Sequence, residues 1–174
     1  SDVYKRQGMQ AESTRNVVEL MRQATTLPLW IKLTPNSGEI VSTAVAAQDA
    51  GADAVVVGNT LLGLSVDIES GRPRLGNFMG GISGAPLRPL MVRLTWQCAQ
   101  VLEIPVIGCG GIATADDALE FIYAGASAVQ VGTATFVHPK TMNLMVGELE
   151  AYCRRKGISA LRTLIGSLDD SPAT

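Results

Sequence analysis

The chain has 174 residues, of which 47% are hydrophobic and 17% are charged, and its formal net charge at pH 7 is −2. The length suffices for one domain with a substantial core, and the composition is that of a folded globular chain rather than a disordered one. The near-neutral charge, without a cluster of Lys or Arg, argues against nucleic acid as a partner. The sequence has no apolar run of about 18 residues, which argues against a membrane-spanning helix.

The three cysteines, Cys98, Cys109 and Cys153, are widely spaced and form neither a disulfide framework nor a metal-binding motif. We therefore expect a reducing, cytoplasmic location and no metal site. Residues 1–7 have neither helical nor strand periodicity, and we interpret them as a tag, a cloning scar or a sequencing artefact.

The first predicted element is a helix over residues 12–25, with Ser13 or Thr14 as its N-cap. A short apolar strand follows over residues 29–33 and carries Lys32 in its middle. A buried lysine is costly unless it is paired. Lys32 therefore either extends outward with its ammonium in water or serves a binding site.

The next unit is a helix over residues 40–50, closed by Gly51, and a strand over residues 54–58. Asn59 and Thr60 follow at the carboxyl end of that strand. In a parallel barrel this end faces the active site. The alternative interpretation of the pair is an Asx-type turn.

A long loop is predicted for residues 61–84, and loops of this length are usually lids or binding loops. Three glycines between residues 80 and 84 precede a predicted helix over residues 87–102, with Pro86 at its first position. A glycine-rich approach to a helix N-terminus is a candidate contact for an anion or for the edge of a ring.

Two β-branched apolar runs, residues 106–108 and 128–131, end in glycine and flank a segment with helical periodicity. This pattern predicts a strand, a helix and a second strand. Thr114 is a suitable N-cap for the helix, and Asp116 and Asp117 in the first turn suit the positive end of its dipole.

Glycines follow both of these strands, as Gly110-Gly111 and as Gly132-Thr133, about 22 residues apart. Without a Cβ, the backbone N–H groups can approach an anion closely. In (β/α)8 barrels the loops after the last two strands often form a phosphate site. The two pairs therefore predict such a site, although glycines can also serve only to form tight turns.

Residues 141–156 are predicted to form an amphipathic helix, and residues 158–168 a shorter one. The predicted strands are centred near Trp30, Val56, Ile107 and Val129. A complete barrel needs about 250 residues. Four βα units thus indicate either a small open α/β sheet or the C-terminal half of a (β/α)8 TIM barrel, and we favour the half barrel.

Five segments, in this order and spacing, resemble the C-terminal half of dihydroorotate dehydrogenase, and more narrowly the catalytic subunit of the NAD-linked class 1B enzymes. They are Ile31-Lys-Leu-Thr-Pro-Asn36, Gly58-Asn-Thr-Leu-Leu-Gly63, Gly80-Gly-Ile-Ser-Gly84, Ile107-Gly-Cys-Gly-Gly111 and Gly132-Thr133. The resemblance extends over residues 8–169, and it implies that residues 8–174 are the C-terminal part of an FMN-binding TIM-barrel domain.

The resemblance implies an FMN-dependent oxidoreductase that converts dihydroorotate to orotate in pyrimidine biosynthesis. Carried over by position, Lys32 would contact the flavin ring, where its charge would stabilise the anionic reduced form. The other implied contacts are flavin packing by Gly58 and Gly84, the flavin 5′-phosphate on Gly110, Gly111, Gly132 and Thr133, and substrate hydrogen bonds from Asn59 and Thr60.

The family pattern also implies what this chain lacks. The class 1B catalytic base is a cysteine on a loop before the lysine strand, and the chain starts after that point. We therefore expect no catalytic residue here and an inactive isolated fragment. Cys109 is interpreted as strand packing near the flavin, and His138 as structural or solvent-facing.

The implied partners are the substrate, an FAD and iron–sulfur subunit that passes electrons to NAD, and a second copy of the full-length subunit. Two alternatives remain. One is a dihydropyrimidine dehydrogenase-like module, and the other is a non-flavin phosphate-binding barrel that acts as a lyase or isomerase. The second alternative leaves Lys32 and the Asn59-Thr60 pair unexplained.

Overall fold

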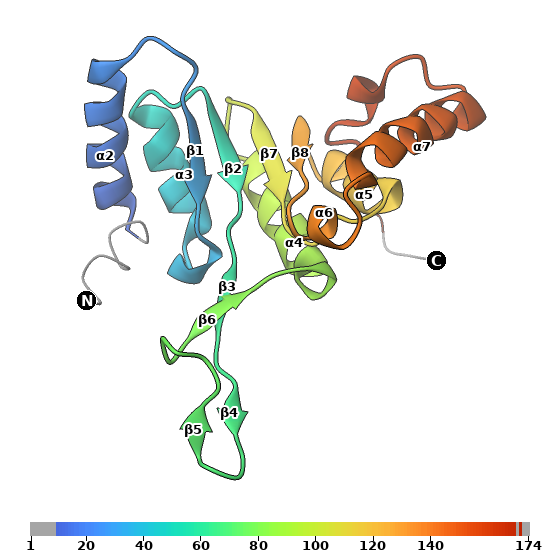
Figure 1. The fold of residues 1–174 in the computed structure, drawn as a ribbon. Coiled ribbons are helices and arrows are strands. Elements are labelled where there is room, and N and C mark those ends of the chain that lie inside the picture. The colour runs from blue at the N-terminus through green and yellow to red at the C-terminus, as the bar shows by residue number, and fades with distance from the viewer. Residues whose placement is uncertain (1–9, 170, 172–174) are drawn as a thin grey trace.

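A computed structural model of the chain describes residues 10–169 and 171 (Figure 1). The segment 1–7, interpreted above as a tag or artefact, lies outside the described residues. No helix within the described ranges is both long and apolar enough to cross a membrane.

A four-stranded parallel sheet forms the centre of the molecule, with strand order β1-β2-β7-β8 (Figure 1). Its strands are β1 (Trp30–Leu33), β2 (Ala54–Val57), β7 (Val106–Cys109) and β8 (Ala128–Gln130). The main helices are α2 (Ala11–Ala24), α3 (Ile40–Asp49), α4 (Arg88–Ala99), α5 (Ala115–Tyr123), α6 (Thr133–Val137) and α7 (Thr141–Lys156). The predicted fold class is confirmed, since four βα units follow one another along one sheet.

The two faces of the sheet differ in how well they are covered. The face toward the helices is buried, with Leu33, Val55 and Val57 at most 2% exposed. On the opposite face only a small cluster centred on Val56 and Ile107 is buried, and Trp30 in β1 remains 56% exposed. Because side chains alternate along a strand, the same apolar runs line both faces.

The helix after β7 forms where the sequence predicts it. Thr114 caps α5 in a capping box: its hydroxyl accepts from the Asp117 N–H at 3.2 Å, and the Asp117 carboxylate accepts from the Thr114 N–H at 2.9 Å. Gly51, at a φ of +97°, follows the end of α3 as predicted.

Two helix starts differ from the prediction. α2 begins after Gln10 without a side-chain cap, so Ser13 and Thr14 lie inside the helix. Pro86 is not the first residue of α4, because a 3-10 turn (Ala85–Leu87) precedes that helix and contains the proline.

The segment predicted as a structureless loop is instead a projecting β-ribbon, called here the arm (residues 61–82; Figure 1). In it β3 (Leu61–Gly63) pairs with β6 (Gly80–Ile82), and β4 (Val66–Asp67) pairs with β5 (Arg72–Pro73), both antiparallel. Asn36 joins the arm to the end of β1: its Nδ2 donates to the Thr60 carbonyl at 2.9 Å, and its Oδ1 accepts from the Leu62 N–H at 2.9 Å.

The C-terminal part of the chain also differs in its helices. α7 has the predicted bounds, but the helix predicted over residues 158–168 is only a 3-10 turn (Leu161–Leu164). Gly157 and Gly166 adopt φ values of +65° and +71°, which end regular helix on both sides of that turn. The short helix α6 was not predicted.

Candidate functional site

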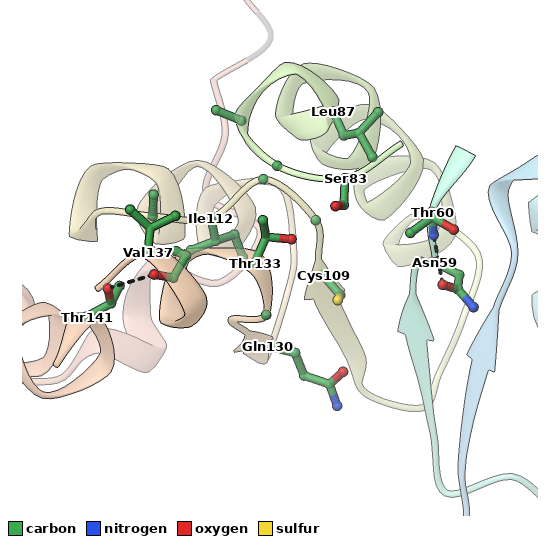
Figure 2. Close-up of a pocket in the computed structure, with 18 of the residues that line it drawn as sticks. Asn59, Thr60, Ser83, Leu87, Cys109, Ile112, Gln130, Thr133, Val137 and Thr141 are labelled. Carbon is green, nitrogen blue, oxygen red and sulfur yellow. Dashed lines mark hydrogen bonds between the residues drawn. The ribbon is translucent and has the colours of Figure 1, made fainter. Parts of the chain in front are cut away.

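A cavity of about 540 Å³ lies at the carboxyl ends of the four parallel strands (Figure 2). Its volume is in the range of small-molecule sites. The cavity brings together all nine residues proposed from the sequence, namely Lys32, Gly58, Asn59, Thr60, Gly84, Gly110, Gly111, Gly132 and Thr133. Residues that are far apart in the chain meet here because parallel strands place their carboxyl ends at one edge.

One side of the cavity presents backbone amides after β7. Gly110 and Gly111 adopt φ values of +129° and +78°, conformations that residues with a Cβ rarely adopt. A Cβ on Gly111 would lie 2.8 Å from the backbone N of Arg88, so this turn lies directly on the start of α4. Outside the pairing of β7 with β8, neither glycine N–H bonds to an acceptor among the described residues.

The end of β8 supplies a second set of amides. Gly132 is the N-cap of α6 and Thr133 its first residue, so their N–H groups lie at the positive end of a short helix. No acceptor for these two amides occurs in the part of the chain that the structure describes. Gly84 lines the cavity next to Thr133, since a Cβ on it would be 3.9 Å from Thr133 Cγ2.

Lys32 supplies the positive charge of the cavity. Its Nζ lies 3.4 Å from Cys109 Sγ and 3.5 Å from Gln130 Oε1, and neither partner is a carboxylate. Among the described residues that line the cavity, Lys32 is the only Lys or Arg, and none is an Asp or Glu. The ammonium charge is therefore available to a ligand.

Asn59 and Thr60 lie at the end of β2, near the root of the arm (Figure 2). Asn59 Oδ1 accepts a hydrogen bond from the Thr60 N–H at 2.8 Å. The pair lines the cavity, whereas the alternative Asx-type turn does not form, because the amide oxygen bonds the next residue rather than the N–H two residues on. The Asn59 Nδ2 group and the Thr60 hydroxyl are the groups that can reach a ligand.

Several lining residues were not identified from the sequence, including Ser83, Gln130, Thr141 and His138. Gln130 had a readable signal, since it is a polar residue that follows Ala128 at strand spacing just before the glycine. His138 is exposed, in agreement with the solvent-facing interpretation, and its carbonyl accepts from the Thr141 hydroxyl at 2.6 Å.

The remaining candidates from the sequence differ in whether they line the cavity. Gly80 and Gly81 pair within the arm and do not line the cavity, so the predicted ligand contact of this glycine cluster is limited to Gly84. Cys109 packs against the cluster of Val56 and Ile107, as the sequence interpretation expects, and it also lines the cavity. Cys98 is buried in α4, and burial raises its pKa to about 11.

We found no arrangement of three or more His, Cys, Asp or Glu side chains suited to a metal ion within the described ranges. The potential ligand groups are therefore amides, hydroxyls and one ammonium. Such groups match an anion at one end of a ligand and a polar ring at the other.

The fold and the cavity thus define a βα-barrel type of protein with a small-molecule site at the carboxyl ends of its strands. A model of the family described as dihydroorotate dehydrogenase matches residues 3–152. The chain belongs to the dihydroorotate dehydrogenase family.

Its relatives are consistent with this membership. The catalytic subunit of dihydroorotate dehydrogenase B (NAD(+)) from Geotalea uraniireducens is 46% identical over 161 residues, which are 92% of this chain and 53% of that protein. The subunit of the same name from Porphyromonas gingivalis is 45% identical, with 92% and 52% covered. The chain therefore spans about half the length of these relatives.

A solved structure extends the similarity to three dimensions. DHODH from Eimeria tenella, crystallised in complex with ferulenol, is 26% identical and superposes with a TM-score of 0.71. The match covers 91% of this chain and 49% of that one. The four βα units therefore correspond to about half of a dehydrogenase of this family.

Proposed function

We propose that this chain is the FMN-binding half of a dihydroorotate dehydrogenase of the NAD-linked class 1B type. The whole enzyme would oxidise dihydroorotate to orotate in pyrimidine biosynthesis. One observation carries the proposal: among the described residues, amides after β7 and β8 that have no acceptor outside the strand pairing share a single cavity with the ammonium of Lys32, which has no carboxylate partner there. The names of the curated relatives support the same activity.

The glycine turns fit a phosphate group. Four amides, from Gly110, Gly111, Gly132 and Thr133, have no acceptor among the described residues outside the strand pairing, and the Thr133 hydroxyl lies beside them. Such a set of amides can bind the oxygens of a phosphate ester even where no lysine or arginine contacts the phosphate. These residues would hold the 5′-phosphate of FMN.

The other end of the cavity suits the flavin ring and the substrate. When bound, FMN supplies the two-electron oxidant for the reaction. Lys32 would lie against the ring, where a fixed cation stabilises developing negative charge, while Gly58 and Gly84 present backbone to it. Asn59 and Thr60 would orient the substrate through hydrogen bonds.

We assign no catalytic base to this chain. None of the described residues that line the cavity is an Asp or Glu, and Cys109 ends β7, far along the chain from β1, rather than lying on a loop before the lysine strand. The proposal places the base in the part of the enzyme that the longer relatives contain and this chain does not span.

The test is a titration of the purified chain with FMN, in parallel with the chain fused to the N-terminal half of a related subunit. We expect the fusion to retain yellow FMN, and its Lys32→Met variant to retain FMN but to oxidise dihydroorotate much more slowly. A fusion that binds no FMN but does bind a sugar phosphate would refute the flavin assignment and favour the lyase or isomerase alternative.

A second comparison addresses the substrate. The fusion should oxidise dihydroorotate faster than 5,6-dihydrouracil, and Asn59→Ala should raise the KM for dihydroorotate while FMN remains bound. Preference for dihydrouracil would instead support the dihydropyrimidine dehydrogenase alternative.

We further propose that the full-length subunit forms a homodimer and works with a separate FAD and iron–sulfur subunit in the cytoplasm. The words "catalytic subunit" in the relatives' names support a second kind of subunit. The three cysteines are free in the structure, which suits a reducing compartment. Reduction of NAD by the fusion only in the presence of that subunit would verify the electron route.

The arm supports the homodimer. Apolar side chains along it are exposed, namely Leu62, Leu64, Val66, Ile68, Leu75, Phe78, Met79 and Ile82. The arm also carries two acidic residues, Asp67 and Glu69, and two basic ones, Arg72 and Arg74, none of them in an ion pair within the described chain. A two-fold interface requires a surface complementary to itself, and a ribbon with both charges meets this requirement.

Analytical ultracentrifugation of the fusion tests the role of the arm. Ile68, which is 84% exposed, should tolerate change in a monomer, so Ile68→Asp should convert dimer to monomer without loss of folding. Val17→Asp on the exposed face of α2 is the matched control and should leave the dimer intact. A fusion that is monomeric before any substitution would refute the homodimer.

A further inference from the structure

An ion pair behind the cavity connects the two helices next to the glycine turn. Arg88 is the first residue of α4, and its Nη1 contacts Asp117 Oδ1 in the first turn of α5. The Asp117 side chain is 9% exposed and that of Arg88 30% exposed. Neither residue lines the cavity, so neither can contact a ligand held there.

The Asp117 carboxylate also holds the end of the glycine turn. Its Oδ2 accepts hydrogen bonds from the N–H groups of Ala113 and Thr114, each at 2.9 Å. Both carboxylate oxygens are therefore used, one by the turn and one by Arg88. The backbone from Gly111 to Thr114 is attached in this way to α4 as well as to α5.

The backbone of Arg88 also packs directly against the same turn. A Cβ on Gly111 would meet the N, Cβ and Cα atoms of Arg88 at 2.8, 2.9 and 3.0 Å. Gly111 thus lies in contact with the residue whose guanidinium holds Asp117. A shift of α4 relative to α5 would move the Gly110 and Gly111 amides out of position.

Charge gives the pair a second role. Asp117 is a buried carboxylate within a few residues of amides that would bind an anion, so its negative charge would oppose a phosphate group. Arg88 offsets this charge, although it is shared with the more exposed Glu120, whose Oε1 lies 3.2 Å from Arg88 Nε. Loss of the guanidinium would leave this carboxylate uncompensated next to the turn.

We propose that Arg88 and Asp117 are positioning residues that fix the Gly110-Gly111 amides and thereby give the cavity its selectivity for a phosphorylated over an unphosphorylated flavin. This inference rests on the proposed FMN site. If the capping box and the ion pair served stability alone, loss of Arg88 would weaken the binding of FMN and of riboflavin equally. The test therefore compares the two affinities.

The test compares Arg88→Gln, Arg88→Lys and Arg88→Gln/Asp117→Asn with the unchanged chain. Arg22→Gln is the matched control, because Arg22 forms an ion pair with Asp53 at 2.9 Å near the amino end of the sheet, away from the cavity. Urea unfolding first establishes that each variant is folded. Hydrogen exchange over residues 109–114 and the Kd for FMN and for riboflavin are then measured, with the chain and with its fusion to the N-terminal half of a relative.

We expect Arg88→Gln to speed exchange in residues 109–114 and to weaken FMN binding roughly tenfold or more, as for a lost charge-assisted hydrogen bond. Riboflavin binding should change by less than about twofold, since it has no phosphate to lose. Arg88→Lys should recover most of the FMN affinity and the double variant part of it, because each reduces the uncompensated charge. Arg22→Gln should change neither flavin affinity.

Equal weakening of FMN and riboflavin by Arg88→Gln would overturn the proposal, as would unchanged FMN affinity or unchanged exchange in the turn. If the unchanged chain and fusion bound neither flavin, the proposed FMN site itself would fail. The exchange measurement would then still decide whether the ion pair fixes the turn.

Discussion

Gly111 offers a direct test of how tightly the glycine turn is packed, through the substitution Gly111→Ala. Its φ of +78° is unfavourable for alanine, and the new Cβ would lie 2.8 Å from the backbone N of Arg88. Gly38 is a matched control, with a φ of +74° and no atom within 4 Å of the position that a Cβ would take. The two substitutions share the backbone strain and differ only in the contact.

The expected magnitudes follow from these two terms. The left-handed conformation costs an alanine about 1–2 kcal/mol, and the loss of unfolded-state freedom on replacing glycine offsets about 0.4–1 kcal/mol of it. This net cost applies to both variants. At Gly111 the contact falls well short of an ordinary separation of about 3.5–4.0 Å, and overpacking of this kind adds roughly 1–3 kcal/mol.

Urea unfolding of Gly111→Ala and Gly38→Ala, followed by FMN titration of the corresponding fusions, measures the difference. We expect Gly111→Ala to be less stable than Gly38→Ala by roughly 1–3 kcal/mol and to lose FMN affinity, while Gly38→Ala keeps it. Equal stability of the two variants, with FMN retained in both, would refute the close contact between the turn and α4.

Three further predictions follow from the local geometry. Thr114→Ala should cost about 1 kcal/mol in urea unfolding, because the Thr114 hydroxyl caps α5 at 3.2 Å. A hydrogen bond from the Leu29 N–H and the Arg22 guanidinium lower the pKa of Asp53, so its contribution to stability is present above an ordinary aspartate pKa of about 3.9 and is lost as pH falls through the lowered value. Asp53→Asn should therefore lower the melting temperature at pH 7, and this difference should shrink toward pH 2. Burial raises the pKa of Cys98 to about 11, so iodoacetamide at pH 8 should leave Cys98 unmodified in the folded chain while Cys109 reacts, as mass spectrometry can verify.

The parallel sheet could be predicted from the sequence because its signals are local. Each strand is a short, mostly apolar run that ends in or is followed by glycine or a polar residue, and buried parallel strands need little more than this. α5 was predictable for the same reason, since Thr114 and Asp117 form its capping box within four residues.

The arm and α6 were not predictable, because their signals are not local. β6 is only three residues long and contains two glycines, so its strand character arises from pairing with β3 across 16 intervening residues, from 64 to 79. α6 is a single short helix rich in threonine and valine, which have low helix propensity. Its position follows from the end of β8 and from its contact with α7.

The candidate site was more predictable than its surroundings. Residues at the carboxyl ends of parallel strands converge whatever the rest of the chain does, so Asn59 and Gly110 could be placed together from strand assignments alone. Ser83 and Gln130 were missed because a single polar residue beside an apolar run has several explanations. Arg88 and Asp117 were beyond reach, since their contact depends on how α4 lies against α5.

The cavity combines two kinds of polar group, backbone amides at the glycine turns and the single ammonium of Lys32. At the glycine turns, neutral amides would receive the anion, and Lys32 is the only Lys or Arg among the described lining residues. Lys32 provides one localised charge, and its contacts are with Cys109 and Gln130 rather than with a carboxylate. A lysine beside the turns would strengthen phosphate binding but would weaken the preference for placing the ring at Lys32. In the proposed FMN site, the single-cation arrangement would therefore fix the direction of the ligand as well as its affinity.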